Sequence, residues 1–252
     1  MKKTLAVLLS LVLIFSIGCF NVPVKADPAD DELHGIVVGD LTANSRGFYS
    51  IYDQSAVRYD EYEHTLYLNN ANISGITGIR YGLCEADDTK PFTIVLSGDN
   101  YIQTNDQNGN TETYGIRSEH FSHSDCVPLI IKGNGTLNIQ VQNTGGYGNG
   151  IAAGGGLTIK GNAEVRVTMD DACKSSGICL DNEHETKLKL DGAAKLTVYS
   201  PEEAFYKCSL AFGKKYTPKV KAGNSANDIK VNKKKPSKKI YDKYSYVSIE
   251  KA

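Results

Sequence analysis

The acidic residues between positions 170 and 181 have the composition of a calcium site. Asp170 and Asp171 are adjacent, and Asp181 follows ten residues later. Calcium is a hard cation that binds through several carboxylate, carbonyl and amide oxygens. We therefore expect calcium as a cofactor, with Asp170, Asp171 and Asp181 as its ligands. Because their spacing matches no known calcium loop, solvated acidic loops are the alternative interpretation.

Tyrosines and lysines supply the candidate ligand-binding residues. The chain has 15 tyrosines and no tryptophan, and an aromatic ring offers an apolar face beside a polar hydroxyl. Tyr114 precedes a Gly-Ile pair and Tyr147 lies in a glycine-rich segment, so both are candidates for stacking on sugars. Lys233, Lys234 and Lys235 form a basic run that can attract an anionic polymer. A solvated lysine loop is the alternative interpretation of that run.

A short sequence motif that recurs five times indicates which elements position these residues. An apolar strand ends at a polar or glycine corner each time, which is Asn-Asn in the first repeat, Ser-Gly-Asp in the second, Gly-Asn in the third and fourth, and Asp-Gly in the fifth. The spacings between repeats are 28, 35, 28 and 31 residues. One such unit cannot bury its apolar face alone, so a strand and turn repeating at this period predict a stacked solenoid. The anchor residues are Leu68, Leu96, Ile131, Ile159 and Leu190.

Each repeat contains signals for two further strands. A second apolar position follows the anchor by five residues at Ile73 and by six at Ile102, Leu137, Val165 and Leu196. A Gly-Ile pair follows in four repeats, and Ala204-Phe205 takes its place in the fifth. Apolar and polar residues alternate within the strands, which is typical of a sheet with one buried face.

These patterns predict an all-β fold, a single-stranded right-handed parallel β-helix of about five coils. Residues 63–212 would form the helix, and residues 27–62 a lead-in with short strands at 35–39 and 47–51 that caps the first coil. Residues 213–252 would form a basic loop and a closing strand at 244–249.

The first 26 residues are typical of a secretory signal peptide. A basic start at 1–3, an apolar run at 5–20 and a small-x-small motif at 24–26 make up the pattern. Residues 16–19 also resemble a lipobox, which leaves lipidation of Cys19 open. Since no second apolar segment follows, we expect no transmembrane segment and a secreted or cell-surface protein.

The charge distribution bears on the partners of the protein, and the cysteine content bears on its core. Residues 27–206 carry 26 acidic and 12 basic residues, whereas residues 207–252 carry 13 lysines and three acidic residues. An acidic body and an export signal argue against nucleic acid as a partner. Five cysteines follow residue 26, and an odd number leaves at least one thiol unpaired. Their spacing fits no zinc motif, so we expect small apolar core residues, with a Cys173–Cys179 disulfide as the alternative.

Several segments together resemble a family of exported bacterial carbohydrate-binding-domain proteins, which look like compact pectate-lyase-type β-helices. The resemblance implies binding of acidic plant polysaccharide, with calcium and without catalysis. It covers most of residues 35–250, and its motifs are core and corner residues that specify fold more than activity. The matching segments are 57–60, 65–73, 94–100, 155–163, 220–223 and 246–249.

The sequence lacks the motifs of the enzymes that share this fold type. Asp170-Asp171 is separated from Cys173 by Ala172, whereas the galacturonase pattern has the cysteine directly after the acidic pair. A lyase would need a base, usually Arg or Lys, beside several calcium-binding carboxylates. Lys132 and Lys160 occupy equivalent places in consecutive repeats and would stack, but a polar ladder on the solvent face is the alternative interpretation. We expect a non-catalytic polysaccharide-binding protein; a polygalacturonate lyase and a surface adhesin are the alternatives.

Overall fold

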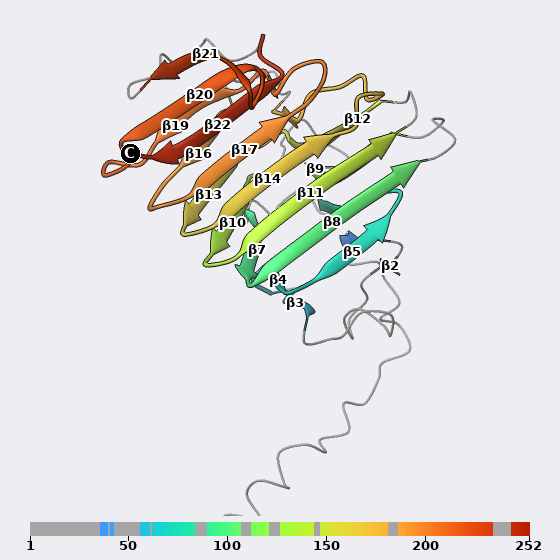
Figure 1. The fold of residues 1–252 in the computed structure, drawn as a ribbon. Coiled ribbons are helices and arrows are strands. Elements are labelled where there is room, and N and C mark those ends of the chain that lie inside the picture. Colours follow the sequence, from blue (N-terminus) through green and yellow to red (C-terminus); the bar gives the residue numbers. More distant parts are fainter. Residues whose placement is uncertain are drawn as a thin grey trace, which may run out of the picture. The chain divides into compact units, whose positions relative to one another are not determined.

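The structure is a computed structural model, and it describes residues 36–39, 41–42, 56–60, 62–83, 90–106, 112–120, 127–143, 147–180, 186–233 and 243–252. These residues form 22 strands and no helix, arranged in three sheets (Figure 1). The all-β prediction is therefore confirmed. The signal peptide, Cys19, and the predicted strand at 47–51 lie outside the described residues.

The first sheet, sheet I, has the strand order β19-β16-β13-β10-β7-β4-β3. Its strands are β3 (Val57–Asp60), β4 (Thr65–Asn69), β7 (Phe92–Ser97), β10 (Leu129–Gly133), β13 (Leu157–Gly161), β16 (Lys187–Leu190) and β19 (Ser209–Phe212). The first strand of each of the five repeats belongs to this sheet, and these strands pair in parallel.

Sheet II has the order β21-β20-β22-β17-β14-β11-β8-β5. Its strands are β5 (Asn72–Gly75), β8 (Asp99–Asp106), β11 (Thr136–Asn143), β14 (Glu164–Met169), β17 (Lys195–Tyr199), β20 (Pro218–Ser225), β21 (Asp228–Lys233) and β22 (Tyr246–Lys251). The strands from β5 to β17 pair in parallel, and β22 pairs with β17 in the antiparallel sense. The closing strand is thus confirmed, while the hairpin β20–β21 was not predicted.

Sheet III has the order β18-β15-β12-β9-β6-β1-β2. Its strands are β1 (Ile36–Val38), β2 (Leu41–Thr42), β6 (Ile79–Leu83), β9 (Thr113–His120), β12 (Gly148–Ala153), β15 (Ile178–Cys179) and β18 (Phe205–Tyr206). The short strand predicted at 35–39 is β1, which pairs with β6 in the antiparallel sense. In sheet I, β3 covers the edge of β4 in the same way.

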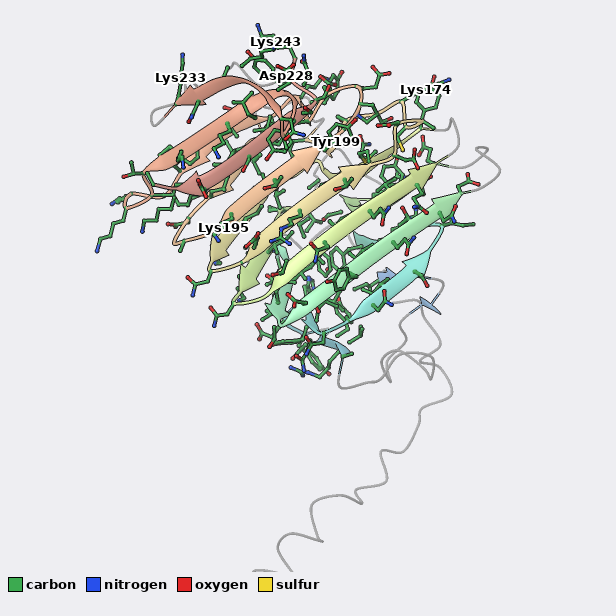
Figure 2. The ribbon with its side chains drawn as sticks, in the orientation of Figure 1. Lys174, Lys195, Tyr199, Asp228, Lys233 and Lys243 are labelled. Carbon is green, nitrogen blue, oxygen red and sulfur yellow. The ribbon has the colours of Figure 1, made fainter. Side chains whose placement is uncertain are left out.

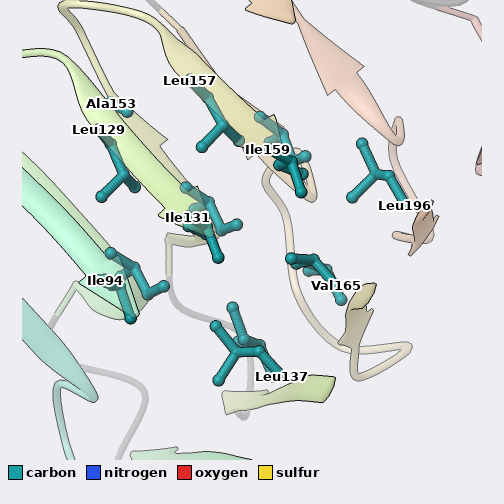
Figure 3. Close-up of a cluster of buried hydrophobic side chains, with 14 of the residues drawn as sticks. Ile94, Leu129, Ile131, Leu137, Ala153, Leu157, Ile159, Val165 and Leu196 are labelled. Atoms are coloured by element: carbon teal, nitrogen blue, oxygen red, sulfur yellow. The ribbon is translucent and has the colours of Figure 1, made fainter. Parts of the chain in front are cut away.

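The chain passes through sheets I, II and III in turn, and it makes this passage five times between β4 and β18. Equivalent residues are stacked, so apolar side chains form continuous buried rows (Figure 3). Each fully buried Leu or Ile contributes about 1.5–3 kcal/mol. Two rows in sheet I are Leu66, Ile94, Ile131, Ile159 and Leu190, and Phe92, Leu129, Leu157, Leu188 and Leu210.

The third passage is offset from the predicted alignment by two residues. Ile131 pairs with Ile94 rather than Leu96, and Ile139 rather than Leu137 pairs with Ile102. The repeat step here is therefore 37 residues, as these pairs show, and not 35. Because side chains alternate with a period of two, a shift of two keeps the same residues inside. The alignment error therefore left the prediction of the core residues intact.

The Gly-Ile pairs form the buried row of sheet III. Ile116 pairs with Ile151, Ile151 with Ile178 and Ile178 with Phe205, so Ala204-Phe205 does replace the pair in the fifth repeat. The glycine is required by the facing sheet: a Cβ at Gly150 would lie 2.1 Å from Cγ1 of Val167. Sheet II therefore fills the space that a side chain would need.

Candidate functional site

The outer face of sheet II carries two stacked rows of polar side chains. Alternation along each strand directs these residues outward, and the parallel register aligns them from strand to strand. Figure 2 shows this face, with Lys195 and Tyr199 at opposite ends of β17. One row is Asn72, Tyr101, Asn138, Arg166 and Thr197; the other is Ser74, Gln103, Gln140, Thr168 and Tyr199.

A groove of about 620 Å³ crosses this face over β5, β8, β11 and β14. Tyr101 lines the groove and is 51% exposed, which is high for a tyrosine in the middle of a sheet. Its neighbour across the strands is Asn138, followed by Arg166. The arrangement places an open aromatic ring beside side chains that donate and accept hydrogen bonds. The remaining lining residues are Asn70, Ala71, Asn72, Asp99, Ile102, Gln103, Ile139, Gln140 and Thr168.

The positive charge of Arg166 in this groove is held in a network of polar contacts. The Nε and Nη2 groups of Arg166 both donate to Oε1 of Glu164, the former at 2.9 Å, and Nη1 donates to Oδ1 of Asn138 at 3.4 Å. Lys195 Nζ lies 3.5 Å from the second oxygen of Glu164. These pairs are partly exposed and contribute little to stability. Their effect is to fix the guanidinium plane over the sheet beside Asn138.

Two of the three predicted metal ligands, Asp170 and Asp171, lie directly after β14. The hydroxyl of Tyr199 donates to Oδ1 of Asp171 at 2.8 Å, and this hydrogen bond raises the pKa of Tyr199 above its ordinary value. Oδ1 of Asp170 accepts a hydrogen bond from the Ala172 N–H at 3.3 Å. Asp181 lies outside the described residues. Within the described ranges, no group of three or more His, Cys, Asp or Glu residues is positioned to hold a metal ion.

Of the two predicted sugar-stacking tyrosines, Tyr114 lies in a strand of sheet III and Tyr147 directly precedes another strand of that sheet. Tyr114, in β9, donates through its hydroxyl to Glu112 Oε2 at 2.7 Å, and the Arg117 guanidinium covers its ring at 4.4 Å. Tyr147 precedes β12 in the neighbouring repeat and is 67% exposed. Its carbonyl accepts the Thr113 N–H, which places the two tyrosines on adjacent strands. One ring face of Tyr114 is therefore covered by Arg117.

The predicted lysine run is described only at its beginning. Lys233 is the last residue of β21 and is exposed (Figure 2); Lys234 and Lys235 lie outside the described residues. In the same strand Lys230 pairs with Asp228 and lowers the pKa of that carboxyl. On sheet I, Lys132 does stack on Lys160, as their equivalent places predicted.

The residues that line the sheet II groove were missed by sequence reasoning. Tyr101 lies in a run of alternating polar residues, 99–106, that resembles any solvent-facing strand. The repeat alignment could have drawn attention to it, but only with the two-residue offset does Tyr101 align with Asn138.

Two of the cysteines follow the simpler interpretation. Cys173 and Cys208 are buried with the apolar core. Cys179 is half-buried in β15. Burial of this kind is typical of cysteines that serve as small apolar residues.

Over the residues described, no helix is long and apolar enough to cross a membrane. No protein-family model, curated protein or solved structure matches this chain.

Proposed function

We propose that this is an exported, non-catalytic protein that binds polysaccharide on the outer face of sheet II. The observation that carries the proposal is the exposed Tyr101 ring in a groove whose other polar side chains are amides, a hydroxyl, the held guanidinium of Arg166 and the carboxylate of Asp99. A sugar ring presents C–H groups on its face and hydroxyls at its rim. An aromatic face surrounded by hydrogen-bonding side chains is complementary to both.

The repeating construction supports a polymeric ligand over a small one. We propose that the five passages through the three sheets form the coils of a right-handed parallel β-helix, since crossover connections between parallel strands are right-handed in nearly all proteins. Successive strands in a sheet lie about 4.8 Å apart. Polar groups that recur along the stack can therefore meet hydroxyls that recur along a glycan.

Calcium and an acidic glycan belong to the proposal as its second part. Asp170 and Asp171 lie at the end of β14, on the exposed side of the chain. Carboxylates of this kind could share a calcium ion with a uronate, which would offset repulsion between an acidic body and an acidic polymer.

The Tyr101→Ala variant tests the binding surface. We expect its affinity for polygalacturonate to fall about tenfold, which corresponds to ~1.4 kcal/mol, because the variant loses the stacking face and retains the fold. Affinity electrophoresis in gels containing polygalacturonate measures the change. Tyr147→Ala, at an exposed tyrosine directly before β12 of sheet III, is the matched control and should bind as the wild type does. The reverse pattern would move the site to sheet III.

Two further conditions in the same assay test calcium and catalysis. If a chelator abolishes the retardation of the protein by polygalacturonate and added calcium restores it, calcium takes part in binding. If a chelator leaves the retardation unchanged, the proposal that calcium takes part is wrong. Ultraviolet absorbance is followed while the protein is incubated with polygalacturonate and calcium. A steady rise from unsaturated products would identify a lyase and contradict the non-catalytic proposal.

A further inference from the structure

A second groove, of about 740 Å³, lies at the corner where the strands of sheet I turn into sheet II. We call it the corner groove. Four exposed lysines line it: Lys189, Lys214, Lys215 and Lys251. The remaining lining residues are Gly161, Asn162, Asp191, Gly192, Ala193, Phe212 and Gly213. These remaining residues lie at the ends of β13 and β19 and in the turns that follow β13, β16 and β19.

The four lysines have no acidic partners among the described residues. No ion pair joins Lys189, Lys214, Lys215 or Lys251 to a described carboxylate. By contrast, Lys195, Lys219 and Lys230 on sheet II are each paired with an acidic residue. Like charges gathered without counterions create a positive potential that attracts anions.

Among the described residues that line the corner groove, Asp191 carries the one side-chain carboxylate. Its Oδ1 accepts the Gly192 N–H at 2.8 Å. It also lies against the next turn, where a Cβ on Gly213 would be only 1.9 Å from the same oxygen. Asp191 thus helps to shape the corner, and four lysines outnumber it.

The positive surface continues from the corner groove onto sheet I. Lys189 pairs with Thr158, which is two residues before Lys160, and Lys160 stacks on Lys132. Three consecutive coils therefore each present an outward lysine on this sheet. A chain with one negative charge per unit could contact several of them at once.

The floor of the groove adds an apolar surface. The half-buried Phe212 ring stacks on Tyr216, with centroids 5.6 Å apart and planes 12° from parallel. Tyr216 is anchored by donation of its hydroxyl to the Ala194 carbonyl at 2.7 Å. Phe212 thus lines the groove together with the lysines, so the groove offers an apolar side chain as well as charge.

We propose that the corner groove binds the anionic groups of a linear acidic glycan polymer. This inference rests on the proposed function and specifies its ligand as polyanionic. Two kinds of polymer carry such repeated negative charges: a polyuronate through its carboxylates and a wall polymer through its phosphodiesters. The probes below distinguish between them.

The test compares two double-lysine variants against charged and neutralised forms of one polymer. Lys214→Ser with Lys215→Ser removes two groove charges. Lys174→Ser with Lys243→Ser removes as many charges near Ser200, beyond the far end of β17 (Figure 2). The probes are polygalacturonate, the same backbone with its carboxylates methyl-esterified, and poly(glycerol phosphate). Affinities are measured by calorimetry at low and high salt.

We expect the groove variant to lose about tenfold in affinity for a charged probe, ~1.4 kcal/mol, and to show a weaker dependence on salt than the wild type. The control variant should keep both properties. A loss of affinity for polygalacturonate identifies carboxylate as the ligand group, and a loss of affinity for poly(glycerol phosphate) identifies phosphate. Equal losses in the two double variants would show that overall charge, and not the groove, attracts the polymer, and would overturn the inference.

The outcomes also separate this inference from the proposed function. One outcome would contradict the corner groove alone: the esterified polymer binds less tightly to the Tyr101 variant, while the charged probes bind equally well with and without Lys214 and Lys215. Binding of charged probes that depends on these lysines but not on Tyr101 would support the groove and contradict the sheet II site. If the wild type binds no probe, both fail.

Discussion

The Phe92→Ala variant is expected to unfold at a much lower urea concentration than the wild-type protein. Phe92 is fully buried, and its ring stacks on Tyr81 with centroids 4.2 Å apart and planes 4° from parallel. It also begins the buried row that continues through Leu129. Replacing a buried phenylalanine with alanine costs about 3–5 kcal/mol, because the apolar contact is lost and a cavity remains. Urea unfolding followed by circular dichroism measures the loss.

The position of the cavity makes this prediction specific. Tyr81 is itself buried and its hydroxyl lies 2.8 Å from Nδ1 of His64, so the ring next to Phe92 cannot easily move to fill the space. Val95→Ala, on the outer side of the same strand, is the control and should cost about 1 kcal/mol or less. If both variants unfold at the same midpoint, the inward assignment of β7 is wrong.

The Asn100→Ala variant should also lose a large part of the stability. Asn100 is fully buried in a row that continues with the apolar residues Leu137 and Val165. Its Oδ1 accepts the Ala71 N–H at 2.9 Å, and its Nδ2 donates to the Thr136 carbonyl at 3.1 Å. Truncation leaves a buried N–H without its acceptor and a small cavity, which together cost about 2–4 kcal/mol.

Two companion variants separate hydrogen bonding from packing. Asn100→Leu restores the volume but not the hydrogen bonds, so it should remain destabilised although leucine matches the rest of the row. Asn138→Ala removes an asparagine from the outer face of the next strand and should change the free energy of unfolding by about 1 kcal/mol or less. A leucine variant as stable as the wild type would show that the bonds of Asn100 contribute little.

Most of the core could be predicted from the sequence because stacking repeats one environment many times. Leu157, Ile159 and Val165 recur at fixed intervals with their counterparts, so each repeat is evidence for the others. The register between neighbouring strands was harder to predict from the sequence. The two-residue offset at Ile131 keeps the same inside residues, so no conflict in hydrophobic pattern revealed it.

The C-terminal strands were predicted only in part, for a physical reason. The residues of β22 alternate cleanly, with Val247 and Ile249 buried, and this strand was anticipated. None of the residues of β21 is buried, and the strand carries lysines, as edge strands often do. Since an exposed charged strand has the composition of a loop, its sequence offered no signal for pairing with β20.

The candidate site was harder to predict than the core, because it depends on which outward residues become neighbours. Tyr101 and Arg166 are 65 positions apart in the chain but only two strands apart in sheet II. Tyr114 was chosen from its glycine neighbour, and that glycine turned out to make room for Ile139 of the facing sheet. Gly115 is therefore explained by packing against Ile139 and does not indicate a ligand-binding site.

The most direct test of the proposed sugar-binding face is an NMR titration of the ¹⁵N-labelled protein with oligogalacturonate in the presence of calcium. The side-chain amide groups of Asn138, Gln103 and Gln140 lie along the sheet II groove. We expect their resonances to shift together and to saturate, while the amide of Asn149 on sheet III stays unchanged. Shifts confined to Asn149 and the residues around Tyr147 would contradict the sheet II site.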